Sequence, residues 1–191
     1  MLDVRLLARC TMNEDIDDEV FEITPLLEAL ILRIESAFES VPYPGDENLI
    51  ASPEHRATCE ECSDLYDHLR GLRWTDAAAS EAWDGWVSHG MSFFLPRAWQ
   101  YYLPAFLIRT IRMGYLSYIG FLPPAGPNVK DWRDRRAACL SHEQCAVVVE
   151  YLDAGLQLFG TRPFLIQKYG AARDHWKAIL ANKGDANTQP N

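Results

Sequence analysis

The stretch that most constrains the fold of this chain is FFLPRAWQYYLPAFLIRTIR, from Phe93 to Arg112. Its aromatic and aliphatic residues keep a helical spacing but cover most of the circumference, so the helix they predict must be buried on several sides. Leu95-Pro96 begins this helix, because the N–H that proline lacks would be unpaired there. Pro104 lies inside the pattern and should kink the helix. We therefore expect a kinked central helix over about residues 95–115.

Prolines, glycines and capping residues divide the rest of the chain into further helices. Thr24-Pro25 begins a helix that the turn VPYPGD ends, and Ser52-Pro53 begins one that we expect to run unbroken to Leu69. Other helices are expected at residues 77–86, from 131, from the Ser141–Gln144 capping box to 159, and from 161 to about 180. No stretch alternates as a strand does. The sequence thus predicts an all-α, single-domain bundle of about six to seven helices around the kinked central helix.

The helical domain is expected to span residues 24–181 of the 191. An acidic N-terminal arm or short helix would precede it at 1–23, and a disordered polar tail would follow at 182–191. The N-terminal residues do not resemble a secretory signal, which predicts a cytoplasmic protein with reduced cysteines. Arginines interrupt the apolar run of the central helix, so no interaction with a membrane is expected.

The negative charge of the chain is concentrated in its first third. Residues 1–70 hold 17 Asp and Glu against 5 Arg, whereas residues 71–191 carry a net charge of +3. An acidic surface repels nucleic-acid phosphates and attracts a basic protein. A solvated surface that only maintains solubility fits the pattern equally well. If the carboxylates bind a partner, the candidate contact residues are Glu14, Asp15, Asp17, Asp18, Glu19, Asp46, Glu47, Glu60, Glu61, Asp64 and Asp67.

The sharpest candidate for chemistry is the group His55, Cys59 and Cys62. On an unbroken helix these residues stand at i, i+4 and i+7 and share one face. A histidine beside a CxxC pair is a soft ligand set suited to zinc. A fourth ligand would come from elsewhere in the chain, with His68, Cys10, Cys139 and His89 as candidates.

Two other interpretations of this group compete with a metal site. The same stripe continues as Tyr66 and Leu69, which is typical of a buried helix face, and core packing is the favoured interpretation. A redox CxxC is less favoured, because its cysteines normally lie at a helix N-terminus in a βαβ unit. In the central helix, Trp99, Tyr101 and Tyr102 similarly predict core packing before a ligand pocket.

Several segments, in their order along the chain, resemble a family of uncharacterised bacterial proteins. The likeness covers roughly residues 26–155. It is carried by Ala37-Phe38, the turn VPYPGD, His55 with the CEEC of 59–62, Gly71 and Trp74, PRA at 96–98 with YYLPA at 101–105, and LSHEQ at 140–144. The resemblance implies an immunity or binding role, because such proteins are encoded near bacterial toxin and secretion loci.

The leading hypothesis is therefore a non-catalytic protein-binding domain. It would be an immunity-type protein that neutralises a basic bacterial effector or toxin through its acidic surface, and it would need no cofactor. The alternative is a zinc-binding helical protein or metalloenzyme built on His55, Cys59 and Cys62.

Overall fold

In the part of the chain that the structure describes, the regular secondary structure is helical. The structure is a computed structural model that describes residues 23–50, 52–80, 90–114, 116–117, 121–123 and 127–186. Within these ranges it contains no sheet, only an isolated bridge between Ile50 and Phe94. The described elements are α1 (Pro25–Phe38), η2 (Asp46–Asn48), α2 (Pro53–Arg56), α3 (Glu60–Leu69), α4 (Trp74–Ala79), η4 (Gly90–Ser92), α6 (Pro96–Arg112), α7 (Pro127–Cys139), α8 (His142–Phe159) and α9 (Pro163–Ala186). The expected all-α bundle is confirmed.

The helix ends form where the capping residues predict them. The Thr24 hydroxyl accepts the N–H of Leu27 at 3.4 Å and caps α1. Ser141 and Gln144 form the reciprocal capping box of α8. After α3, Gly71 has a φ of 70°, a conformation that favours glycine and ends the helix.

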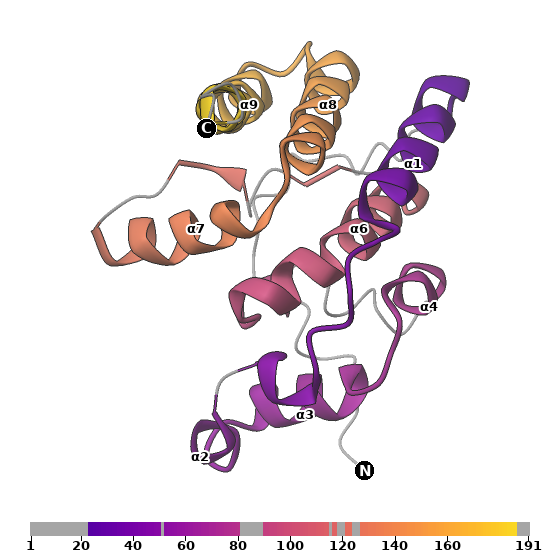
Figure 1. Ribbon diagram of the computed structural model, residues 1–191. Coiled ribbons are helices and arrows are strands. Elements are labelled where there is room, and N and C mark those ends of the chain that lie inside the picture. The colour runs from indigo at the N-terminus through magenta and orange to yellow at the C-terminus, as the bar shows by residue number, and fades with distance from the viewer. Residues whose placement is uncertain are drawn as a thin grey trace.

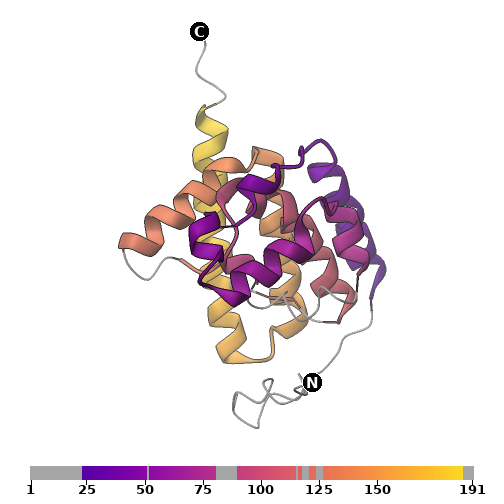
Figure 2. The ribbon, with the colours of Figure 1, turned by 90° about the horizontal axis from the view of Figure 1, so that it is seen from below.

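The central helix α6 lies between its neighbours as the sequence predicts. From Ala98 to Ile111, all of its residues are buried except Gln100 and Arg109. Helices α1, α4 and α7 pack against α6, while α8 packs between α1 and α9 (Figure 1). Seen from below, α9 runs across the whole domain (Figure 2). Pro104 lies inside α6, and the kink expected there stays a prediction.

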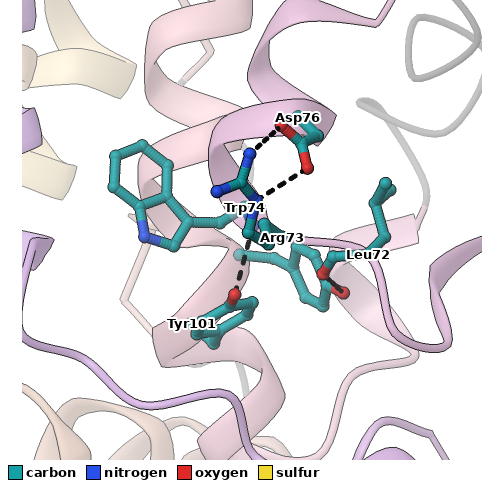
Figure 3. Close-up of polar contacts among 6 residues, drawn as sticks. Leu72, Arg73, Trp74, Asp76 and Tyr101 are labelled. Carbon is teal, nitrogen blue, oxygen red and sulfur yellow. Dashed lines mark hydrogen bonds and ion pairs between the residues drawn. The ribbon is translucent and has the colours of Figure 1, made fainter.

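Several helix boundaries differ from those expected. Helix α7 begins at Pro127 rather than at 131. The helix expected at 77–86 begins earlier, at Trp74, because the indole is buried and the Tyr101 hydroxyl accepts the N–H of Trp74 at 3.4 Å (Figure 3). It also ends earlier, at Ala79, because Ser80 is extended, and Trp83 and Trp86 lie outside the described residues. The last helix continues past Leu180 to Ala186, so residues 182–186 of the expected disordered tail are helical, and residues 187–191 lie outside the described residues. In α9, Lys183 Nζ donates to the carbonyl of Ala138 on α7 at 3.5 Å.

Candidate metal centre

The helix expected from Pro53 to Leu69 is broken into α2 and α3. At the break, both the N–H and the hydroxyl of Thr58 donate to the carbonyl of His55 at 3.0 Å. These bonds turn the chain, and Cys59 takes an extended conformation as the N-cap residue of α3. The three candidate ligands were expected to share one helix face. This prediction is wrong for His55, which lies on α2.

The turn nevertheless brings His55, Cys59 and Cys62 together. One potential ligand atom from each residue lies within 4.8 Å of the other two. Zinc binds thiolate sulfur at about 2.3 Å and imidazole nitrogen at about 2.0–2.1 Å, which places neighbouring ligand atoms roughly 3.5 Å apart. The observed spacing needs only a small closure of the side chains to reach that geometry. The donor set and its spacing thus fit a zinc ion.

Exposure changes steadily across the cluster. The Cys62 side chain is buried, Cys59 is half-buried and His55 is exposed. A metal bound here would therefore rest on the core through one thiolate and face the surface through the imidazole. The core interpretation of the sequence fits Cys62 but not His55.

The two cysteines lie at a helix N-terminus, which the sequence analysis did not expect. Cys59 is the N-cap residue of α3 and Cys62 lies in its first turn, where the helix dipole favours negative charge. Burial, the hydrogen bond to Cys59 and the charges of Cys59 and Glu61 nevertheless raise the pKa of Cys62 to about 11. A redox or nucleophilic cysteine needs a lowered pKa, so this environment opposes that chemistry. A metal ion would displace the thiol proton.

None of the expected fourth ligands joins the cluster within the described part of the chain. His68 and Cys139 are absent from the group of converging ligand atoms. The Cys139 thiol instead donates to the carbonyl of Arg135 on α7 at 3.3 Å. Cys10 and His89 lie outside the described residues.

The candidate partner-binding acids divide into three sets. Glu14, Asp15, Asp17, Asp18 and Glu19 lie outside the described residues. Asp46, Glu47 and Asp67 make local contacts, described below. Glu60, Glu61 and Asp64 are exposed on α3, and no ion pair or hydrogen bond of their side chains occurs in the described part of the chain.

The local contacts of Asp46 give it a structural role. Its carboxylate accepts the hydroxyl of Tyr43 at 2.5 Å and the N–H of Gly71 at 3.2 Å, which joins the loop after α1 to the end of α3. Burial, with the hydrogen bond to Asp46, raises the pKa of Tyr43 to about 12. Glu47 accepts from Asn48 at 2.8 Å, and Asp67 lies 3.8 Å from Arg70.

The aromatic residues of α6 pack in the core. Trp99, Tyr101 and Tyr102 are each at least 95% buried. The Tyr102 hydroxyl reaches the carbonyls of Leu69 and Leu72 at 2.9 and 2.8 Å, and the Tyr101 ring points toward the start of α4 (Figure 3). The favoured core interpretation holds for all three. Trp99 also lines a small cavity, together with Arg133 and Arg136, which the sequence analysis did not single out.

Searches of protein-family models, curated proteins and solved structures found no match to this chain. Within the described ranges, no helix has both the length and the apolar character needed to cross a membrane. The site itself must therefore carry the functional argument.

Proposed function

We propose that this protein holds a zinc ion at His55, Cys59 and Cys62, where the ion fastens α2 to α3. The observation that carries the proposal is the convergence of three soft ligands within 4.8 Å from two separate helices. When bound, zinc would supply a fixed link between these ligands, and its remaining position would be open to water or another ligand.

Helix α2 needs such a link. It is one turn of four residues, and none of them is buried. A helix this short is unstable without tertiary contacts, and Arg56 over the ring of Tyr66, 3.8 Å from its centroid, is its cation–π contact with α3. A metal–imidazole bond at the neighbouring His55 would add a second link from this turn to α3.

Purified wild-type protein, prepared without chelator, is expected to contain about one zinc ion per chain by elemental analysis. Cys59→Ser and Cys62→Ser should each lower zinc affinity at least tenfold, roughly the loss that even an outer-shell substitution causes. Cys139→Ser is the matched control and should keep its zinc, because that thiol bonds to Arg135. Wild-type protein that is free of metal, and that takes up none from added zinc, would exclude the site.

A second candidate function is binding of a basic protein through the acidic face of α3, which includes Glu60, Glu61 and Asp64. These carboxylates are exposed and have no ion-pair partner within the described residues, so their charge is available to a partner. Glu60 and Glu61 also follow directly on Cys59, so a zinc link would fix the helix that carries these carboxylates. An immunity-type role, in which the domain neutralises a basic effector without catalysis, fits this arrangement.

Charge reversal tests this second function. Glu60→Lys, Glu61→Lys and Asp64→Lys combined should slow association with a basic partner about tenfold or more at low salt. The partner would come from affinity capture in source cells, with washes at low and high salt. A control with the same change of charge is the triple reversal of Glu35, Glu39 and Glu143, on α1, at its C-cap and on α8. Equal binding by both variants would remove α3 from the interface.

A further inference from the structure

A small cavity lies where α6, α7 and α9 meet, away from the candidate metal centre. Its volume is about 10 Å³, the scale of one water molecule or one monatomic ion. Trp99, Trp176 and three aliphatic side chains form its apolar part, and Arg133, Arg136 and His175 form its polar part. Helices α7 and α9 lie on the same side of the bundle (Figure 1). The cavity thus combines two cationic side chains with a small, partly open space.

Arg136 is unusual because its guanidinium is buried without an acid. The residue is only 5% exposed. Its Nη2 donates to the carbonyls of Ser92 and Phe94 at 3.1 and 2.5 Å, and its Cζ lies 3.1 Å from the centroid of the Trp132 ring. Its Nε is buried and has no hydrogen-bond partner. A buried donor without an acceptor costs about 1–3 kcal/mol, and more when it is charged.

Arg133 repeats the same pattern one helical turn earlier on α7. Its Nη1 donates to the carbonyl of Leu122, but its Nε is also buried without a partner. Burial lowers the pKa of both arginines, and the charge of Arg133 lowers that of Arg136 further. The two guanidinium groups therefore repel each other at a site where little water screens their charges.

The acids nearest in the sequence do not neutralise this pair. On α7, Asp131 pairs with Arg135 at 3.2 Å and Asp134 pairs with Lys130. On α9, Asp174 pairs with Arg173 at 2.8 Å. The described residues therefore provide no carboxylate for Arg133 or Arg136.

We propose that this cavity binds a small monovalent anion, a halide or a carboxylate group, between Arg133, Arg136 and His175. The two unpartnered Nε–H groups are charged donors, the kind that forms the strongest hydrogen bonds to anions. The volume is on the scale of one small anion and is smaller than phosphate or sulfate would need. An anion there would offset one of the two positive charges and join α7 to α6 and α9.

The test is thermal unfolding of the whole protein in sodium chloride, sodium formate and sodium isethionate at matched ionic strength. Isethionate carries a bulkier sulfonate and no carboxylate, so it is the reference. We expect chloride or formate to raise the Tm saturably, by about 3 °C or more at ten times the Kd. The salt that acts identifies the anion as a halide or a carboxylate. Equal Tm values in all three salts would overturn the proposal.

Two variants on α7 separate this site from general salt effects. Arg133→Met should abolish the anion-specific rise in Tm. Arg135→Met removes the same charge from an exposed arginine and should keep the rise. A rise that persists in Arg133→Met would also overturn the proposal. Should Arg133→Met fail to fold, NMR of the wild-type protein decides. Excess broadening of the ³⁵Cl line or of the formate ¹H line that the other anion removes supports the site, and the absence of both rejects it.

Discussion

Replacing Gln144 with methionine is expected to lower the free energy of unfolding by about 3 kcal/mol. Methionine keeps the length and approximate volume of glutamine, so the change removes hydrogen bonds with little effect on packing. Urea unfolding followed by circular dichroism measures the change, with the m-value as a check that compactness is unaltered.

The size of this effect follows from the three groups that the Gln144 amide serves. Its oxygen accepts the N–H of Ser141 and the side-chain amide of Gln100, both at 3.0 Å. Its nitrogen donates to the carbonyl of Ala37, also at 3.0 Å. Gln144 is only 4% exposed, so water cannot easily replace these bonds. Each buried group left without a partner costs about 1 kcal/mol or more.

Ser141→Ala is the matched control, because it breaks the other half of the same capping box. That substitution removes only the acceptor of the Gln144 N–H, at 3.1 Å, and should cost about 1 kcal/mol. If Gln144→Met costs no more than Ser141→Ala, the bonds to Gln100 and Ala37 contribute nothing, and Gln144 is an ordinary capping residue.

Gln144 also shows how far the sequence predicts this structure. The spacing of Ser141 and Gln144 predicts the capping box, because both partners lie within one helical turn. Nothing in that spacing indicates that the same side chain joins α8 to Ala37, which is 107 residues away. Local patterns therefore predict the helices and their caps. The contacts between helices depend on three-dimensional packing, which periodicity does not encode.

At the candidate metal centre, the sequence predicts which residues come together but not the local structure that brings them together. The sequence singles out His55, Cys59 and Cys62, and the structure does bring them together. The reason given, one continuous helix, is wrong, because Thr58 bonds back to His55 and breaks the helix. The residue types and their short spacing thus predicted the cluster correctly, whereas the expected continuous helix did not.

Arg133 and Arg136 escaped the sequence analysis for a different reason. The segment DWRDRR reads as a solvated helix face with mixed charges, and its exposed pairs fit that description. Only the fold shows that two of its arginines point inward without an acid. The one available signal, Trp132 four residues before Arg136, indicates stacking on the same face but not burial.

Gly155→Ala is the second substitution with a large expected effect, a loss of about 2–3 kcal/mol in the free energy of unfolding. A Cβ at this position would lie 2.2 Å from Cε1 of Tyr169, where α8 meets α9. The Tyr169 ring cannot move aside easily. It is 1% exposed, its hydroxyl donates to the carbonyl of Leu116, and it stacks on Phe159 with centroids 5.8 Å apart.

This loss should appear although alanine favours a helix by about 1 kcal/mol over glycine. Gly170→Ala, within α9, isolates that helical preference, because no atom lies within 4 Å of its added Cβ. Gly170→Ala should therefore stabilise the protein by about 0.5–1 kcal/mol. Opposite signs for the two variants would show that the α8–α9 contact, rather than helix propensity, requires glycine at 155. A stabilising effect of both would mean that α9 can move away from α8 at little cost.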